Sequence, residues 1–286
     1  MTEDPRLMIM MTHNMREKIL AYVEERRCRE GGFCFYKLEE PNGSDTYFAL
    51  SILDWLDAPP GNSRTVTYLQ KMQHEDGSYD SVFAAFYSLK SLRLLKVEPL
   101  HDPWPYILKH VRRDRIHADQ LPSEILSVFK RMTYLVDLYS IFKNEADPVL
   151  EHSMIRFILD FKNEDSGFGY LQSTLSETAK ALVMLRALSY PLDDLRVDLF
   201  LRQCEIPQYG FTEIPGRSLP YLEFVYGGVL AASTVDYQLQ YADSCIDFIK
   251  SCQTRSGGFS RAMHGGIATL ENTFYAVHVL KLLSVL

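Results

Sequence analysis

The sequence predicts an all-α fold in which six tandem helix–loop–helix units form one ring. Three observations predict it. A short glycine–aromatic loop recurs along the chain, an amphipathic segment precedes each loop, and a segment that is apolar on nearly every side follows it. An amphipathic helix cannot bury its apolar stripe alone, and a fully apolar helix needs neighbours on several sides. An inner ring of apolar helices inside an outer ring of amphipathic helices satisfies both requirements.

The recurring loop has a nearly constant period. Its closing aromatic residues are separated by 46, 89, 43 and 48 residues. The interval of 89 is close to two periods, so we expect a sixth copy without the loop near residue 123, where Leu121-Pro122-Ser123-Glu124 opens a helical pattern. Glycine allows positive φ or close backbone approach, and the aromatic ring is expected to pin the loop onto the ring of helices. The five loops are Gly31-Gly32-Phe33, Asp76-Gly77-Ser78-Tyr79, Ser166-Gly167-Phe168, Tyr209-Gly210-Phe211 and Gly257-Gly258-Phe259.

The segments on either side of the loops predict the two kinds of helix. Residues 65–73 and 242–253 repeat apolar side chains at intervals of three and four, which is typical of outer helices with one wet face. Residues 46–53 and 273–280 are apolar nearly all round and are predicted to be inner helices. No Pro/Gly/Ser-rich linker interrupts the series. We therefore expect residues 1–286 to form a single α/α toroid domain, a six-hairpin α6/α6 barrel.

Composition and charge exclude several classes of function. The net charge is −7, and no basic stripe of the kind that binds nucleic acid occurs. The basic stretch 109–115 is short and contains an acid, so we interpret it as a solvated helix end. No window of about 18 apolar residues predicts a membrane span. Five irregularly spaced cysteines favour free thiols in a reducing compartment, which predicts a cytoplasmic protein.

Two motifs in the last copy carry a family resemblance. Cys252-Gln253 followed by Gly257-Gly258-Phe259, and then Asn272-Thr273-Phe274-Tyr275-Ala276, resembles the repeat of the prenyltransferase and squalene-cyclase superfamily. The β subunits of the protein prenyltransferases look most similar. The resemblance implies a central cavity lined with aromatic residues that accepts an isoprenoid or another hydrophobic small molecule. It also leaves open a helical partner subunit that wraps the ring.

The catalytic residues of that superfamily are not matched. The protein prenyltransferases hold zinc with an Asp-x-Cys pair and a His. Phasing places Glu223 or Leu222 at the Cys, Asn272 at the His, and Tyr221 or Pro220 at the Asp. Because zinc prefers thiolate and imidazole ligands, a zinc-dependent thiol prenyltransferase is disfavoured, although Zn²⁺ or Mg²⁺ bound in another way stays open.

Other acidic motifs give no clear metal site. The Asp-x-Asp-Asp tetrad of the cyclases does not occur. The run 193–198 resembles a magnesium-binding motif, but it is expected to open an outer helix, where the helix dipole favours acids. Acids also gather at the expected starts of the inner helices: Asp45, Asp80, Glu177, Glu223 and Glu271. They either form an acidic cavity mouth or serve as ordinary helix-capping residues.

The resemblance suggests a set of site residues. Glu223 and Asn272 are placed at the reacting end as candidate catalytic residues. Arg217 corresponds approximately to a residue that contacts a substrate diphosphate, with Arg261 and His264 nearby, and an arginine fork suits phosphate. Tyr221 starts an inner helix beside them. Candidate cavity aromatics, which could equally fill a core, are Tyr47, Phe83, Phe86, Tyr134, Tyr226 and Tyr275. His152 and His278 are interpreted as structural.

Three hypotheses for function follow. The first is an enzyme that acts on a prenyl diphosphate or terpenoid in the central cavity without the family's zinc site. The second is a non-catalytic lipid-binding or interaction protein that kept the toroid. The third is a toroid enzyme that acts on glycans, with paired acids such as Glu223 and Glu177. All three depend on closure of the ring.

Overall fold

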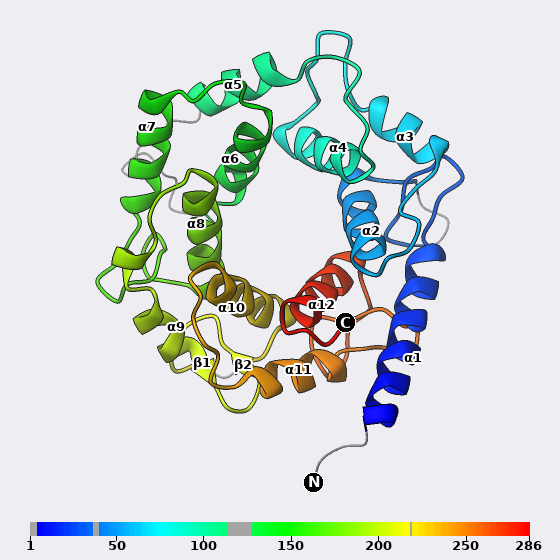
Figure 1. Cartoon of the computed structure of the whole chain (residues 1–286), viewed down its shortest axis with the longest axis vertical. Coiled ribbons are helices and arrows are strands. Elements are labelled where there is room, and N and C mark those ends of the chain that lie inside the picture. Colours follow the sequence, from blue (N-terminus) through cyan, green and yellow to red (C-terminus); the bar gives the residue numbers. More distant parts are fainter. Residues whose placement is uncertain (1–4, 37–39, 114–126, 128, 218) are drawn as a thin grey trace.

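The computed structural model describes residues 5–36, 40–113, 127, 129–217 and 219–286, with the backbone alone for residues 5–12. Twelve α-helices lie within these ranges, and they alternate between an outer and an inner position (Figure 1). The outer helices are α1 (Pro5–Glu24), α3 (Ser63–Gln70), α5 (Trp104–Arg113), α7 (Pro148–Leu159), α9 (Asp198–Cys204) and α11 (Ala242–Ser251). The inner helices are α2 (Gly43–Trp55), α4 (Val82–Leu94), α6 (Lys130–Phe142), α8 (Leu175–Ala187), α10 (Leu222–Thr234) and α12 (Leu270–Leu282).

The ring of helices closes, as the sequence predicted (Figure 1). In the inner ring, the Phe274 side chain of α12 contacts the Phe48 ring of α2 with centroids 5.1 Å apart. In the outer ring, the loop after α11 packs on α1, and a methyl group at Gly258 would lie 2.5 Å from the Tyr22 ring. First and last repeats are therefore joined in both layers.

The predicted elements agree with the helices observed. Residues 65–73 correspond to α3 and residues 242–253 to α11, while residues 46–53 and 273–280 lie inside α2 and α12. The segment 121–124, expected to open the third inner helix, lies outside the described residues, and α6 is described from Lys130. The acidic run 193–198 forms a short 3₁₀ helix, η2 (Asp193–Leu195), before α9 begins at Asp198.

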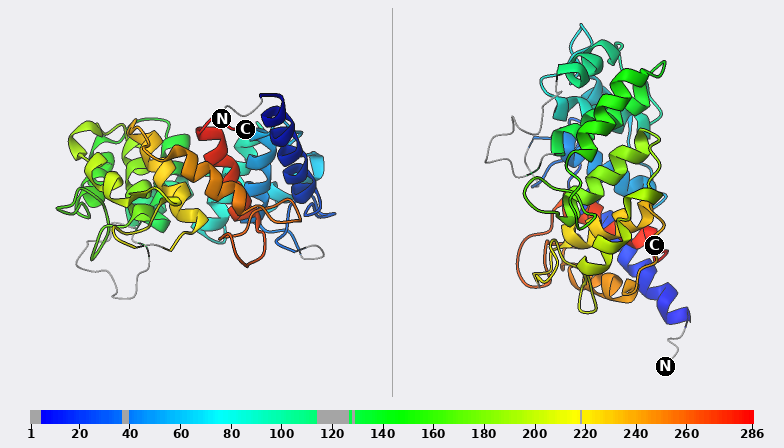
Figure 2. Two further views of the ribbon diagram at one scale, coloured as in Figure 1. Left: turned by 90° about the horizontal axis from the view of Figure 1, so that it is seen from below. Right: turned by 90° about the vertical axis from the view of Figure 1, so that its left-hand side faces the viewer.

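The inner helices begin at one edge of the ring, which we call the loop edge. The connections between outer and inner helices project from this edge, the lower one in the left view of Figure 2. Two of these connections also reach the neighbouring repeat there. The amide of Leu175 at the start of α8 donates to the carbonyl of Glu213, and the amide of Leu222 at the start of α10 donates to the carbonyl of Arg261, each at 2.9 Å. Side chains carried by these loops are therefore gathered at one mouth of the ring.

The loop aromatics are buried, as predicted, and a threonine fixes three of them. The amides of Phe33, Phe168 and Phe259 donate to the hydroxyls of Thr46, Thr178 and Thr273 at 2.9–3.1 Å. Each threonine lies in the first turn of an inner helix, and its hydroxyl in turn donates to the carbonyl of the N-cap residue. A buried loop amide is thus satisfied without a β-sheet partner. The one short sheet among the described residues pairs β1 (Glu205–Ile206) with β2 (Gly210–Phe211).

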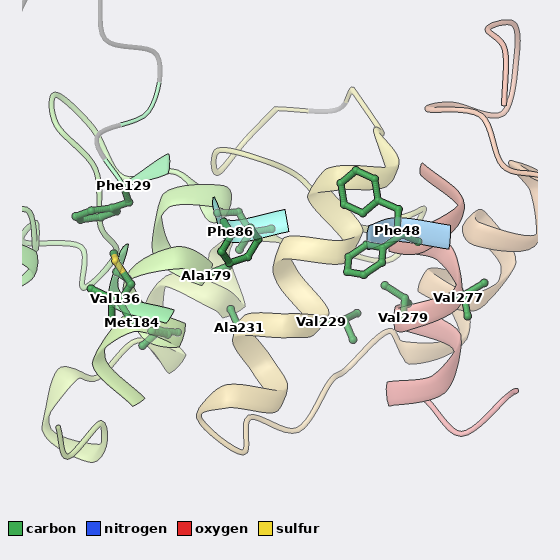
Figure 3. Close-up of a cluster of buried hydrophobic side chains, with 14 of the residues drawn as sticks. Phe48, Phe86, Phe129, Val136, Ala179, Met184, Val229, Ala231, Val277 and Val279 are labelled. Carbon is green, nitrogen blue, oxygen red and sulfur yellow. The ribbon is translucent and has the colours of Figure 1, made fainter. Parts of the chain in front are cut away.

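The core lies between and along the inner helices. Figure 3 shows Val136 of α6, Met184 of α8, Val229 of α10 and Val279 of α12 in one continuous layer. None of the five cysteines, all of which lie in the described part of the chain, forms a disulfide, and Cys204 and Cys252 pack in this core. Among the described helices, none is long and apolar enough to cross a membrane.

Candidate functional site

The inner helices carry a continuous set of aromatic side chains, which we call the aromatic belt. Most of these side chains occupy the fifth or sixth position of their helix, so that neighbouring helices present them at similar heights. α8 carries no aromatic residue and leaves the belt open on its side. The belt consists of Tyr47, Phe48 and Trp55 on α2, Phe83, Phe86 and Tyr87 on α4, Tyr134 on α6, Tyr226 on α10, and Phe274 and Tyr275 on α12.

Ring contacts pass from helix to helix along the belt. The Tyr226 and Tyr275 rings stack with centroids 4.4 Å apart. Phe274 next to them lies 5.8 Å from Tyr47, and Phe86 lies 4.4 Å from Tyr134. Such tilted and stacked pairs are the preferred geometries of aromatic side chains. The candidate cavity residues expected from the sequence are therefore all part of one surface: Tyr47, Phe83, Phe86, Tyr134, Tyr226 and Tyr275.

The tyrosines of the belt are not completely buried. Tyr47, Tyr226 and Tyr275 each remain partly accessible. Burial nevertheless raises the pKa of all three phenols, because a phenolate is poorly solvated there. Weakly polar, partly accessible surface of this kind suits contact with apolar groups.

A histidine belongs to the same surface. The imidazole of His278 on α12 stacks on Trp55 with centroids 4.5 Å apart and also contacts Tyr226 and Phe274. Burial lowers the pKa of His278 to about 4, and its buried Nδ1 makes no hydrogen bond. The imidazole is therefore neutral at physiological pH. Sequence reasoning treated this residue as structural, because a lone histidine in an apolar helix carries no other signal.

Tyrosine hydroxyls gather toward the loop edge around Glu271. The Tyr275 hydroxyl donates to the Glu271 carboxylate at 2.8 Å. The Tyr87 and Tyr134 hydroxyls are 3.2 Å apart. Burial raises the pKa of both phenols, and the charge of Glu271 adds to this effect.

Three of the predicted site residues meet at the loop edge. The Arg261 side chain forms an ion pair with Glu223, with its Nε 2.6 Å from the carboxylate oxygen. The Arg261 guanidinium also lies over the Tyr221 ring, 3.9 Å from the centroid. The hydrogen bond with Glu223 raises the pKa of Arg261. The Glu223 carboxylate is neutralised by a cation and held at the mouth of the ring.

The remaining predicted residues are dispersed along the loop edge. Arg217 and His264 are exposed on the connections before α10 and α12. Asn272 lies half-buried in the first turn of α12, where its backbone amide donates to the Thr269 hydroxyl. Glu177, proposed above as a partner of Glu223, is instead buried and accepts hydrogen bonds from the Phe129 amide and the Lys180 ammonium. That carboxylate holds the start of α6 against α8.

The residues at the family's zinc positions do not fit zinc. Tyr221 or Pro220, Glu223 or Leu222, and Asn272 supply one carboxylate at most, and Arg261 already pairs with it. No group of three or more His, Cys, Asp and Glu side chains able to hold a metal ion occurs in the described part of the chain. Zinc sites need three or four nitrogen or sulfur ligands in most cases.

The closed double ring with its aromatic interior is an α/α toroid. The chain belongs to the prenyltransferase alpha-alpha toroid domain family, whose model matches residues 6–95 and 107–286. This finding confirms the resemblance and the fold predicted from the sequence. None of the curated proteins compared with the chain matches it.

Two solved structures are similar in fold. One is protein geranylgeranyltransferase-I of Candida albicans, complexed with GGPP. It has a TM-score of 0.60 at 15% sequence identity, over 84% of this chain and 83% of that chain. The other is a variant of the type II terpene cyclase MstE from Scytonema, in complex with geranylgeranyl dihydroxybenzoate. It has a TM-score of 0.62 at 11% identity, over 98% of this chain and 100% of that chain.

Proposed function

We propose that this protein binds a prenyl or terpenoid chain against the aromatic belt and acts on it as an enzyme, without the family's zinc site. The observation that carries the proposal is the belt itself, a continuous run of partly accessible, desolvated rings on α10, α12, α2, α4 and α6. Burying an apolar chain there removes hydrocarbon surface from water. The electron-rich ring faces would also stabilise positive charge that develops on an isoprenoid carbon.

The loop edge is the side at which a polar head group is expected. Arg217 is exposed there, and Arg261 lies beside the mouth of the ring with its guanidinium fixed over Tyr221. A diphosphate would compete with Glu223 for Arg261, because guanidinium pairs with phosphate through the same donors. Glu223 would then be released beside the reacting end of the ligand, where it could accept a proton. Asn272 in the first turn of α12 would offer a neutral hydrogen-bonding group there.

Fluorescence titration tests the binding step. Trp55 lies in the belt and Trp104 lies on the outer helix α5, so a Trp104→Phe background leaves Trp55 as the only tryptophan. Farnesyl and geranylgeranyl diphosphate are expected to change its emission saturably. Tyr226→Ala should weaken binding about tenfold, the effect of losing about 1.4 kcal/mol of contact. Tyr106→Ala, on α5, is the matched control and should leave the affinity unchanged. Absence of saturable binding would remove the proposal.

A turnover assay separates an enzyme from a non-catalytic binder. Release of diphosphate and conversion of the prenyl chain are followed with the wild type and with Glu223→Gln. The substitution keeps the size of the side chain but removes the proton acceptor, so turnover should fall by about 10²-fold or more if Glu223 is the base. Binding without turnover would favour the binding-protein alternative. Unchanged turnover in Glu223→Gln would show that the site assignment is wrong.

A further inference from the structure

The wall formed by α4 and α6 differs from the rest of the aromatic belt, because it carries two polar pairs. The Tyr87 and Tyr134 hydroxyls meet at 3.2 Å. Three residues further along both helices, the Lys90 ammonium donates to the Asp137 carboxylate at 2.7 Å. Residues three apart on a helix share a face, so the ion pair lies on the same interior wall as the tyrosines, one turn further from the loop edge.

The ion pair is held in an apolar setting. The side chains of Lys90 and Asp137 are only 24% and 28% exposed. The ammonium lies 5.8 Å from the centroid of the Phe86 ring, within the range of a cation–π contact. Burial acts to lower the pKa of Lys90, but Tyr47 and Asp137 outweigh it and the pKa lies above its ordinary value. Lys90 and Asp137 thus place two full charges beside rings that otherwise suit hydrocarbon.

Helix packing alone gives no reason for this pair. Partial desolvation of two charges opposes their attraction, and replacing such a pair by apolar side chains of similar size is often neutral or stabilising. The pair also has hydrogen-bond donors and acceptors beyond the one bond that joins its two side chains. Among the described residues, the Lys90 ammonium donates one hydrogen bond of the three it can make, and the Asp137 carboxylate accepts one. A donor and an acceptor therefore remain free side by side on the interior wall.

We propose that Lys90 and Asp137 form a subsite for a hydroxyl group on the ligand, so that the substrate class is an oxygenated prenyl or terpenoid compound. A hydroxyl can accept from the ammonium and donate to the carboxylate at the same time. The pair is neutral as a whole, so it does not select an anionic diphosphate, which is expected at the arginines of the loop edge. This inference rests on the proposed function and refines it.

The subsite should discriminate strongly against hydrocarbon. A ligand without a hydroxyl would cover the ion pair and leave its free donor and acceptor without water or another partner. Sites built to bind a hydroxyl reject the analogue that lacks it for this reason. The matched probes are farnesol and farnesene, which share a carbon skeleton and differ in the hydroxyl. Binding is followed by the emission of Trp55 in the Trp104→Phe background.

The wild-type belt is expected to bind farnesol at least about tenfold more tightly than farnesene. The double variant Lys90→Met with Asp137→Leu should lose this preference and bind the two ligands alike. The control is Lys143→Met with Glu151→Leu. It removes an ion pair of the same length, 2.7 Å, with side chains 29% and 17% exposed, outside the belt between the end of α6 and α7. This control should keep the preference.

The outcomes distinguish the inference from the function on which it rests. If neither probe binds the wild type, the subsite and the proposed binding of prenyl chains both fail. If both bind with equal affinity, or if the double variant keeps the preference for farnesol, the subsite is wrong while the belt still binds prenyl chains. Should the apolar double variant fail to fold, the reversed pair Lys90→Asp with Asp137→Lys is used, because it retains one donor and one acceptor. The reversed pair is expected to preserve the preference, and its loss would contradict the subsite.

Discussion

Single residues in the interior are kept neutral by what surrounds them. The tyrosines of the belt have raised pKa values and His278 has a lowered one, and in each case burial is the largest cause. A neutral lining suits a hydrocarbon ligand, since a fixed charge would demand a counter-charge. Lys90 and Asp137 are the exception on the belt-bearing wall, and they neutralise each other. The interior surface is therefore an apolar lining that contains one ion pair, Lys90 with Asp137.

The buried imidazole of His278 predicts a loss of stability in acid. Its pKa is about 4 in the folded protein against 6.5 for an ordinary histidine. Between these values the unfolded chain binds a proton that the folded one does not, so stability falls as the pH drops from 6.5 through about 4. At pH 5 the loss due to His278 is about 2 kcal/mol. Urea unfolding at pH 7 and pH 5 is expected to show a correspondingly smaller decrease in His278→Gln than in the wild type.

His152 provides the control for this effect, because it is exposed on α7. His152→Gln should retain the full decrease in unfolding free energy between pH 7 and pH 5. An equal pH dependence in the wild type and His278→Gln would contradict the prediction. The result would mean that other groups dominate the acid sensitivity and that the imidazole is not desolvated in the belt.

At the scale of elements, the repeated loop and its inner helix act as one unit. The buried amide of Phe259 donates to the Thr273 hydroxyl at 3.1 Å, and Phe33 and Phe168 do the same in their repeats. The buried amide of the loop is thereby hydrogen-bonded to a side chain of the helix that follows the loop. This device explains how a short glycine–aromatic loop stays ordered with so little sheet around it.

Removal of one such threonine hydroxyl is expected to destabilise the protein. Thr273→Val keeps the shape of the side chain but leaves the Phe259 amide buried without an acceptor. The expected decrease in unfolding free energy is about 1–3 kcal/mol. Thr67→Val on α3 is the control, because Thr67 is exposed and its change should cost less than about 0.5 kcal/mol. Equal effects of the two substitutions in urea unfolding would contradict the role of the threonine.

Periodicity predicted the elements well and their contacts poorly. The glycine–aromatic loops and the all-round apolar segments were enough to place inner and outer helices in the right order. The threonines were missed, although Thr46, Thr178 and Thr273 each lie in the first turn of an inner helix and could have been found by aligning the copies. The ion pair of Glu223 with Arg261 was also missed. It joins residues 38 positions apart, and no local pattern reports such a contact.

At the scale of the whole molecule, closure turns six similar hairpins into one enclosed interior. Each inner helix is covered on both sides by its neighbours, and α12 meets α2 through Phe274, Phe48 and Trp55. The period of the loops predicted the number of hairpins and hence the ring. It could not predict which side chains face inward on each helix, because an all-round apolar helix has no distinct stripe. The polar positions Lys90 and Asp137 are visible only once α4 and α6 lie side by side.

Closure makes the junction of the last loop with α1 critical for the whole ring. Gly257 has a positive φ of 94°, and a methyl group there would lie 2.2 Å from the Lys18 carbonyl oxygen. Gly265 has a similar φ of 86°, but nothing lies within 4 Å of its added methyl group. Alanine at either site is destabilised to the same extent by the left-handed backbone conformation, by about 1–2 kcal/mol. Only Gly257→Ala also pushes the last repeat away from the first.

We therefore expect Gly257→Ala to lower the unfolding free energy by at least about 2 kcal/mol more than Gly265→Ala, as overpacked sites do. The damage should be located at the junction. Amide hydrogen exchange should accelerate first in α1 and in the turn around Gly257, while α6 and α8 on the far side of the ring keep their protection. Equal stability of the two variants would mean that the ring is not held shut at this point. Uniform loss of protection in Gly257→Ala would instead show that the toroid opens only as one cooperative unit.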